Sequence, residues 1–509
     1  MSNVRVRFAP SPTGGLHLGG VRTVLFNYLF AKKHGGTFIV RIEDTDRSRY
    51  VEGAEKYIFD CLEWCGLTPD ESVLHSGSYA PYRQSERKDM YRQYAEKLVE
   101  EGHAYYAFDT HGEIEQMREK LKAAGSGSLQ YDAAVRMKMN NSLRLLPEET
   151  RALIENGTPY VIRIKLNAGE IVTLTDMIRG EINFETINVD DKVLIKADGM
   201  PTYHLAVVVD DYLMKITHAF RGEEWLPSAP VHLLLWKYLF GFENMPQWAH
   251  LPLILKPDGN GKLSKRDGDR LGFPVYAMDW QDPKSGEITK GFKELGFLPE
   301  AFLNLLAMLG WNPGTEQEIM SIEEMAQAFS MDRVHKGGAK FDFEKAKWYN
   351  HEWIKRTDSG KLSELVIHDL VSKGLVVNDA DYLIKVIELI KERCTLLSDF
   401  YEQTSYFFKS PEAWDTDAVK PKWNEAKANF FTEFINLLSG DNEFSGASIE
   451  TIFKTLAGEK NIKPGELQLP MRIMLVGGKF GPAVFEIAAM IGKEETINRI
   501  QRAIPAFKN

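Results

Sequence analysis

The sequence predicts a multidomain α/β protein with a parallel sheet near its N-terminus and an all-helical C-terminal region. Three observations support this prediction. The chain has 509 residues, and a single hydrophobic core does not normally support a chain of this length. A strand, a glycine-rich loop, a helix and a second strand follow one another at its start, and helical periodicity dominates after about Phe341.

Composition places the chain among ordinary soluble globular proteins. Hydrophobic residues make up 44% and charged residues 26% of the sequence, and the mean hydropathy is -0.30. The formal net charge of -10 argues against a protein that coats nucleic acid indiscriminately, although a local basic face can still bind phosphates. The three cysteines form no CxxC pair, and neither a signal peptide nor an apolar stretch of membrane-spanning length is evident. We therefore expect a reducing, cytoplasmic location.

The N-terminal segment is typical of a βαβ unit. Val4–Phe8 is the first predicted strand, and apolar residues then recur at helical spacing from Val21 to Leu29 until Gly35-Gly36 end the helix. Thr37–Ile42 is the second strand. Such a unit implies parallel strands with a ligand site at their carboxyl ends. The loop RFAPSPTGGLHLGG (Arg7–Gly20) lies at that end.

The pattern becomes mixed after about residue 85, which indicates an inserted domain. A helix is predicted near Tyr91–Gly102, and strands are predicted at Tyr160–Leu166 and Ile171–Leu174. Alternating apolar residues at Tyr203–Val209 predict a strand that rejoins the first domain. A basic loop flanked by glycines follows at Gly259–Gly268.

The C-terminal region after about Phe341 shows the spacing of amphipathic helices. The apolar residues that share helical faces are predicted to be core: Leu383, Ile387, Ile390, Cys394 and Leu397, and further along Phe431, Phe434 and Leu437. No internal repeat or low-complexity tract interrupts this region.

The opening loop has the composition of an anion site. Its glycines allow close backbone approach, and the helix that begins near Leu18 is expected to direct free N–H groups and its positive dipole end toward the loop. Thr13 and His17 add a hydroxyl donor and an imidazole donor, which suits a nucleotide triphosphate that is attacked at its α-phosphorus. As an isolated pattern, however, these residues would more often form a turn with a surface histidine.

The second candidate segment is KLSKR (Lys262–Arg266), which has three cations within five residues. A loop of this kind can close over phosphates, with each lysine acting as a compact point charge. As an isolated pattern it would more often be a solvated basic turn.

Together these segments resemble the two signature motifs of class I aminoacyl-tRNA synthetases, HIGH (here HLGG, His17–Gly20) and KMSKS (here KLSKR). Further segments closely resemble the bacterial glutamyl-tRNA synthetases: VRIEDTDRSRY, DGMPTYHLAVVVDDYLMKITHAFRGEEW and FDFEKAKWYNHEW. The resemblance runs from residue 4 into LPMRIMLVGGKFGPAVFEIAAMIGKE near the C-terminus. It covers nearly the whole chain.

The resemblance implies a class I, Rossmann-like catalytic domain with an insertion. On this basis residues 1–84 and 199–255 are the two halves of the catalytic domain, and residues 85–198 are an inserted domain that binds the acceptor end of tRNA. Residues 256–340 are a stem-contact region that carries the KLSKR loop, and residues 341–509 are an all-α anticodon-binding region.

The implied reaction joins L-glutamate to tRNA(Glu) in two steps. Glutamate and ATP, with Mg²⁺, form glutamyl-adenylate, and the glutamyl group then passes to the 3′-terminal adenosine of tRNA. The resemblance also implies a monomer and tRNA-dependent activation of glutamate. Some relatives hold a structural zinc in the insertion, but the corresponding segment His103–Asp109 has no cysteine, so we expect no zinc.

The resemblance assigns roles to individual residues. Thr13, His17, Lys262 and Lys265 would be catalytic. Gly14, Gly19, Gly20, Trp225, Lys262, Ser264, Lys265 and Arg266 would bind ATP, and Arg7, Ala9, Ser11, Glu43, Tyr203 and Arg221 would bind glutamate. Gly20 replaces the second histidine of the general motif, a change usual in this family.

Several of these residues also have simpler interpretations. Glu43 could belong to a turn at the end of a strand, and Tyr203 could be core. Arg221 could pair with Glu223 or Glu224. Val207 stands where many relatives carry asparagine, which leaves one polar contact of the pocket undecided.

Other functions fit parts of the pattern. A glutaminyl-tRNA synthetase shares the catalytic motifs but continues into β-barrels, whereas this chain continues into helices. A shorter relative that glutamylates a modified tRNA base has no anticodon domain, and an HxGH-type small-molecule nucleotidyltransferase does not need about 165 helical residues. A non-catalytic RNA-binding paralogue would be expected to lose His17 or Lys265. Whether tRNA(Gln) is also charged stays open.

Overall fold

A computed structural model describes residues 3–508. The chain forms two compact units. The first comprises Met1–Glu294 and Phe302–Phe343, and the second comprises Leu295–Ala301 and Glu344–Asn509. None of the helices in the described part of the chain is both long and apolar enough to span a membrane.

The first unit is built on a six-stranded sheet in the order β2-β1-β8-β9-β5-β6. The strands β2, β1, β8, β9 and β5 run parallel, and β6 pairs antiparallel with β5. β1 and β2 each contain three successive buried residues, as expected for strands covered on both faces. The predicted parallel sheet is confirmed. The strands are β1 (Arg5–Phe8), β2 (Thr37–Val40), β5 (Ile171–Asp176), β6 (Gly180–Glu185), β8 (His218–Gly222) and β9 (Gln247–Leu251).

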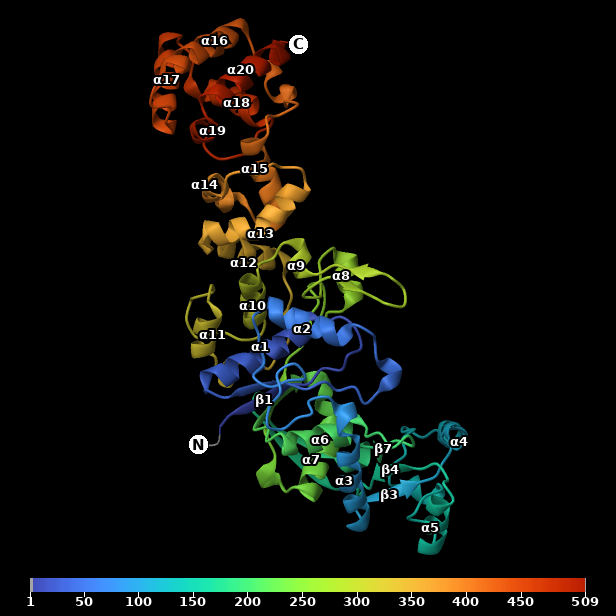
Figure 1. Ribbon diagram of the computed structural model, residues 1–509. Coiled ribbons are helices and arrows are strands. Elements are labelled where there is room, and N and C mark those ends of the chain that lie inside the picture. Colours follow the sequence, from blue (N-terminus) through green and yellow to red (C-terminus); the bar gives the residue numbers. More distant parts are fainter. Residues whose placement is uncertain (1–2, 509) are drawn as a thin grey trace. The chain divides into compact units, whose positions relative to one another are not determined.

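Helices cover this sheet. α1 (Leu18–Lys33) connects β1 to β2 and packs against both, as the βαβ pattern predicts. α2 (Ala54–Trp64) follows β2. α3 (Lys88–Glu100), α6 (Tyr203–Leu213) and α7 (Ala229–Leu239) lie side by side (Figure 1), and α7 packs against β5.

The prediction of a strand at Tyr203–Val209 is wrong, because this segment is the first part of helix α6. Every residue from Leu205 to Asp211 is buried, so the helix is apolar almost all round and shows no amphipathic period. A short buried helix and a buried strand cannot be separated by periodicity alone, and the three valines favoured the strand. The helix has a direct consequence for function, because its last turn carries Asp210 and Asp211.

The segment after residue 85 forms a small antiparallel sheet in the order β3-β4-β7. Its elements are β3 (Ala104–Ala107), α4 (His111–Ala123), α5 (Pro147–Glu155), β4 (Val161–Ile164) and β7 (Val193–Ile195). The β5–β6 hairpin also lies between residues 85 and 198, but it pairs with the main sheet through β9. This stretch of chain therefore contributes to two sheets.

The remainder of the first unit contains short elements. The segment predicted as a basic loop is only partly a loop, because Lys265 begins helix α8 after Ser264. The Asp267 carboxylate accepts hydrogen bonds from the backbone and hydroxyl of Ser264 and stabilises this helix start. The elements are β10 (Ile254–Leu255), α8 (Lys265–Leu271), β11 (Trp280–Gln281), β12 (Ile288–Thr289), α9 (Phe292–Leu295), α10 (Pro299–Met308), α11 (Ile322–Ala328) and β13 (Ala339–Lys340). The end of α9 and the start of α10 fall within Leu295–Ala301 and belong to the second unit.

The described part of the second unit is helical, as predicted. Its helices are α12 (Phe343–Arg356), α13 (Ser359–Ser372), α14 (Ala380–Ile390), α15 (Phe400–Phe408), α16 (Glu425–Gly440), α17 (Gly446–Glu459), α18 (Pro464–Val476), α19 (Val484–Ile491) and α20 (Lys493–Lys508). The predicted core residues Leu383, Ile387, Ile390, Cys394, Phe431 and Phe434 are buried, and Leu397 packs against them.

Leu437 is an exception, because its side chain is 46% exposed while Leu438 is fully buried. The buried stripe of α16 thus continues from Phe434 by four residues rather than three. We expect Leu438→Ala to lower the free energy of unfolding by about 2–5 kcal/mol and Leu437→Ala by less than about 0.5 kcal/mol. Urea unfolding followed by far-ultraviolet circular dichroism measures both variants, and equal losses would contradict the prediction.

Candidate active site

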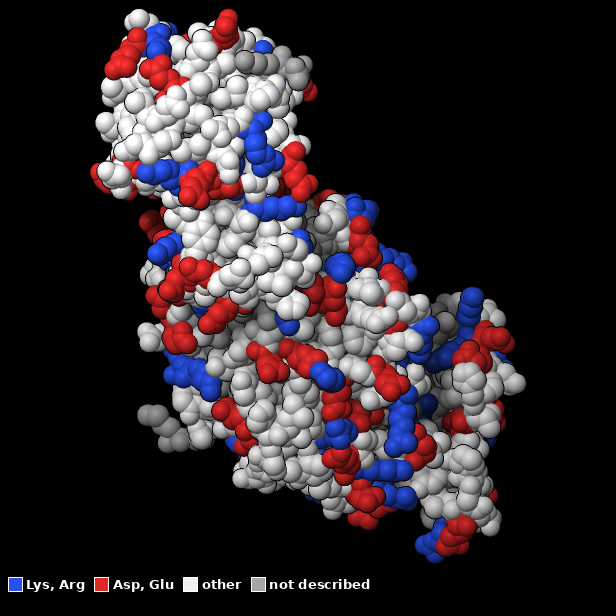
Figure 2. Space-filling model, turned by 45° about the horizontal axis from the view of Figure 1, so that its top comes forward, with Lys and Arg blue, Asp and Glu red and all other residues white. Residues whose placement is uncertain are grey.

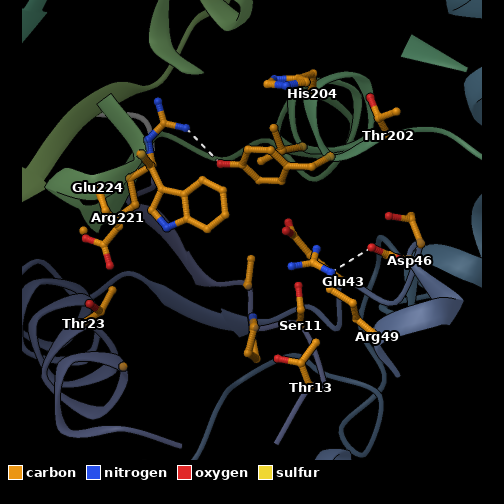
Figure 3. Close-up of a pocket in the computed structure, with 18 of the residues that line it drawn as sticks. Ser11, Thr13, Thr23, Glu43, Asp46, Arg49, Thr202, His204, Arg221 and Glu224 are labelled. Carbon is orange, nitrogen blue, oxygen red and sulfur yellow. Dashed lines mark hydrogen bonds and ion pairs between the residues drawn. The ribbon is translucent and has the colours of Figure 1, made fainter. Parts of the chain in front are cut away.

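A cavity of about 890 Å³ lies beyond the carboxyl ends of β1 and β8 in the first unit. Figure 3 shows Ser11 and Thr13 on one side of it and Arg221 and His204 on the opposite side. The predicted site residues that line it are Arg7, Ala9, Ser11, Thr13, His17, Gly19, Gly20, Glu43, Tyr203, Arg221, Trp225 and Lys262. The predicted site residues Gly14, Ser264, Lys265 and Arg266 are not among the described residues that line the cavity.

His17 is the N-cap of α1, and its Nδ1 accepts a hydrogen bond from the Gly19 amide at 3.3 Å. The proton of the neutral ring therefore resides on Nε2, and this atom is buried with no partner in the described structure. Burial, together with the nearby charge of Lys262, lowers the pKa of His17 to about 4. At neutral pH the ring can thus donate a hydrogen bond to an anion without carrying charge.

The prediction that α1 presents free N–H groups is wrong. The Leu18 amide donates to the Val275 carbonyl at 3.0 Å, and the Gly20 and Val21 amides donate to the His17 carbonyl at 2.8 and 3.1 Å. The chain itself occupies these donors, so the imidazole of His17 is the available hydrogen-bond donor at this helix start. A Cβ at Gly20 would lie 2.7 Å from Leu16 Cδ1, so a larger residue there would require the end of the Leu16 side chain to shift.

The KLSKR segment only partly reaches the cavity. Lys262 lines it, with Nζ 2.6 Å from the Glu224 carboxylate. Lys265 instead pairs with Glu287 at 3.2 Å. Both ion pairs are well exposed, and exposed pairs contribute about 0–1 kcal/mol. Phosphate groups could therefore displace either carboxylate at little cost.

Arg7 and Glu43 each form an ion pair with another residue of the protein. The Arg7 guanidinium donates to the Asp211 carboxylate at 3.1 Å. Arg41 is fully buried and joins Asp211 at 2.8 Å to Glu43 at 3.0 Å. Burial raises the pKa of Glu43, although Arg41 opposes the shift. The carboxylate of Asp211 thus comes from the end of α6, the helix that the sequence pattern did not reveal.

Arg221 differs, because no carboxylate of the described residues pairs with it. Its Nε donates to His250 Nε2 at 2.9 Å, and its Nη1 contacts Tyr203 Oη at 3.2 Å and His232 Nδ1 at 3.0 Å. Its Nη2 is buried with no acceptor among residues 3–508. The alternative pairing with Glu223 or Glu224 does not occur, since Glu223 pairs with Arg179 and Glu224 with Lys262.

Sequence reasoning missed four side chains that hold Arg221, either by direct contact (His250 and His232) or through one of these histidines (Asp176 and His204). These are Asp176 at the end of β5, His250 on β9, His232 on α7 and His204 on α6. Each lies in an apolar segment, and a single histidine in such a segment is more often a satisfied core residue than a functional one. The only local sequence feature that pointed to this cluster was Asp176, an acidic residue at the end of the strand β5.

No metal cluster is evident in the described residues, where no three His, Cys, Asp or Glu side chains lie close enough to hold an ion. The three cysteines, Cys61, Cys65 and Cys394, are buried and unpaired. The expected lack of zinc stays a prediction.

Comparisons with known proteins place the chain in a family. Residues 3–348 match the family described as tRNA synthetases class I (E and Q), catalytic domain, and residues 361–504 match the anticodon binding domain. The glutamate–tRNA ligase of Flavobacterium psychrophilum is 52% identical over 501 residues, which cover 98% of this chain and 99% of the relative. That of Christiangramia forsetii is 50% identical over 507 residues and 100% of both chains.

The chain belongs to the glutamate–tRNA ligase family.

Solved structures of this family agree with the fold. The crystal structure of a glutamate tRNA ligase from Elizabethkingia meningosepticum, in complex with its amino acid, is 47% identical and superimposes with a TM-score of 0.95 over 99% of this chain and 100% of that one. The structure of the glutamate-tRNA synthetase from Elizabethkingia anophelis gives a TM-score of 0.92, also at 47% identity and over 99% and 100% of the two chains. The predicted family, fold class, ligase function and enzyme class are confirmed.

The histidines of this ligase make its stability sensitive to acid. The pKa values of His17, His204 and His218 are about 4, mainly because burial disfavours the charged ring. Between about pH 6.5, the ordinary pKa of histidine, and about pH 4, the unfolded chain binds protons that the folded chain does not. The contribution of these histidines to the free energy of unfolding is therefore fully present above about pH 6.5, and it is lost as the pH drops through this window.

We expect His218→Phe to reduce that pH slope by up to about 1.4 kcal/mol per pH unit. His218 lies at the start of β8 and is not among the residues that line the cavity, so catalysis should be little affected. Urea unfolding at several pH values measures the slope. A stability that does not change between about pH 6.5 and 5, or an unaltered slope in the variant, would contradict the prediction.

Proposed function

We propose that this enzyme activates L-glutamate with ATP in the cavity beyond β1 and β8 and transfers the glutamyl group to the 3′-terminal adenosine of tRNA(Glu). The supporting observation is that one cavity is lined both by Arg221, a buried cation with no carboxylate partner among the described residues, and by His17, a neutral imidazole donor. The cation suits a carboxylate of glutamate, and the imidazole suits a phosphate oxygen.

In the first step a carboxylate oxygen of glutamate attacks the α-phosphorus of ATP, a P–O bond breaks and pyrophosphate leaves. In the second step the ribose hydroxyl of tRNA attacks the activated carbonyl and AMP leaves with the bonding electron pair. Such displacements need positioning and charge stabilisation. Mg²⁺ enters as part of the MgATP substrate, held mainly by phosphates and water.

The proposed roles of the residues follow the two sides of the cavity. Arg7, Ala9, Ser11, Glu43, Tyr203 and Arg221 bind glutamate, and Glu43 receives its ammonium group. Thr13, Gly14, His17, Gly19, Gly20 and Trp225 hold ATP. Lys262, Ser264, Lys265 and Arg266 act after the KLSKR segment moves toward the phosphates, which requires Lys265 to leave Glu287.

The proposed tRNA contacts follow the proposed domains. Residues 85–198 contact the acceptor end, residues 256–340 the stem and residues 341–509 the anticodon. In support, the cavity wall formed by residues 85–198 carries Arg118, Arg163, Lys192 and Lys196. Cationic and acidic side chains are interspersed on the face shown in Figure 2, so phosphate contacts should be local. We also propose a monomeric, cytoplasmic enzyme that works without zinc.

Aminoacylation of purified tRNA(Glu) and tRNA(Gln), each with glutamate and with glutamine, tests the proposal. We expect glutamate to be attached to tRNA(Glu) and glutamine to neither tRNA. Glutamate-dependent exchange of pyrophosphate into ATP should require added tRNA(Glu). Charging with glutamine, or efficient exchange without RNA, would overturn the corresponding part of the proposal.

A further inference from the structure

Among the residues that the structure describes, the hydrogen-bond acceptors of Arg221 are all neutral groups. A guanidinium has five N–H donors and no acceptor, and three of those donors go to His250 Nε2, His232 Nδ1 and Tyr203 Oη. The aromatic group that the guanidinium contacts is also uncharged, because Arg221 lies 4.6 Å from the ring centre of Trp248. The positive charge of Arg221 is thus solvated by the protein but not neutralised at short range, in contrast with that of Arg7.

The position of the proton on His250 follows from its two neighbours. Its Nε2 must accept, because Arg221 Nε can only donate. Its Nδ1 therefore carries the proton and donates it to Asp176 at 2.6 Å. Asp176 is itself held by the amides of Ile178 at 2.9 Å and Arg179 at 3.0 Å. These contacts favour the ionised carboxylate and lower the pKa of Asp176.

A second branch reaches Arg221 through two more histidines. His232 Nδ1 accepts from Arg221 Nη1, so the proton of His232 lies on Nε2 and is donated to His204 Nδ1 at 3.1 Å. His232 is 1% exposed, and burial beside Arg221 drives its pKa well below the ordinary value. His204, which lines the cavity (Figure 3), is also neutral because burial lowers its pKa to about 4.

Arg221 and the residues of the two branches originate on different elements. Arg221 on β8 stands opposite His250 on β9 in the parallel register, Asp176 closes β5 beside them, and His232 comes from α7. Acceptors from a sheet and a helix thus hold the guanidinium from two sides. A flexible arginine side chain would otherwise lose rotamer freedom on binding a ligand.

We propose that Asp176, His250 and His232 are positioning residues that hold Arg221 in one orientation with its charge unneutralised, so that a carboxylate of the amino-acid substrate becomes its counter-ion. Neutral acceptors are essential to this arrangement, because a protein carboxylate in the same place would compete with the substrate. The inference rests on the proposed function, which assigns Arg221 to glutamate.

A matched pair of variants at His232 tests the proposal. In both His232→Asn and His232→Asp, an oxygen takes the place of Nδ1 and the same ring volume is lost, so the two variants differ chiefly in charge. We expect the KM for glutamate to rise roughly tenfold or more in His232→Asp relative to His232→Asn, while the KM for ATP stays equal in the two. Aminoacylation of tRNA(Glu) measures both constants.

Asp176→Asn provides a second test on the other branch. It removes the anion that receives the His250 proton and favours a ring that turns an N–H toward Arg221 Nε. We expect a higher KM for glutamate and an unchanged KM for ATP in the folded fraction, which circular dichroism and thermal unfolding establish.

Measuring Arg221→Gln beside these variants distinguishes an incorrect glutamate site from an incorrect role for the positioning residues. If Arg221→Gln leaves the KM for glutamate unchanged, the proposed site itself is wrong. If Arg221→Gln raises it but the two His232 variants are equal, the positioning inference alone is overturned. Parallel increases in the KM for ATP would assign these residues to packing and also overturn it.

Discussion

Arg221→Gln should lower kcat/KM for glutamate by about two to four orders of magnitude, because the substrate carboxylate would then be buried without a counter-ion. Leaving one partner of a buried ion pair unmatched destabilises by about 3–5 kcal/mol, and each 1.36 kcal/mol corresponds to a factor of about ten. Since the side chain contacts His250, His232 and Tyr203 rather than a protein carboxylate, its charge is available to a ligand. Steady-state aminoacylation of tRNA(Glu) measures the loss.

Arg5→Gln is the matched control for this experiment. Arg5 lies on β1 and pairs with Glu71 at 2.9 Å, and it is not among the residues of the cavity wall. Its replacement should affect stability more than kcat/KM. The assignment of Arg221 to glutamate would be wrong if the two variants had similar kinetics, or if Arg221→Gln acted mainly on the KM for ATP.

The second large effect is expected at His17. Replacing this residue by alanine removes a neutral N–H donor from the cavity wall, and loss of one such donor to developing charge lowers kcat by about 10²–10³. Because the pKa of His17 is about 4, the ring is neutral across the neutral range. We therefore expect the difference between the variant and the original enzyme to stay constant between about pH 6 and 8.

The effect on catalysis can be separated from the effect on α1. His17 also caps this helix, and loss of a cap costs about 1 kcal/mol. Asparagine is a good N-cap but is shorter than the imidazole, so His17→Asn should restore stability without restoring kcat. His34→Ala, at the exposed C-terminal end of the same helix, should leave kcat unchanged. Recovery of kcat in His17→Asn would show that capping, not donation, is what matters.

Local patterns predicted much of this fold. Periodicity over short stretches of sequence predicted the βαβ unit at the start, the strands β4 and β5, the helix α3 and the helical second unit. The pattern failed at α6, because a helix buried on every side has no amphipathic period. The prediction that Leu437 is buried was also wrong. Because the buried stripe of a helix advances by three or four residues, both Leu437 and Leu438 were candidates for the same core position, and Leu438 is the buried one.

The chemistry of the cavity was only partly predictable. The resemblance identified Arg7 and Arg221 together, and nothing in their local sequence distinguishes them. In the structure Arg7 has Asp211 as its partner, whereas Arg221 has neutral acceptors. Asp176 and His250, which complete the arrangement, are 74 residues apart in the chain, so no short motif could reveal them.

The sequence by itself thus determined the family, the types of side chain available for the reaction and most of the secondary structure, because these depend on neighbours along the chain. Only the tertiary structure decided which cation is neutralised, which ring nitrogen carries a proton and which helix amides are already occupied. Those properties depend on burial and on charges that folding brings close through space, and both change when a distant segment packs against the site.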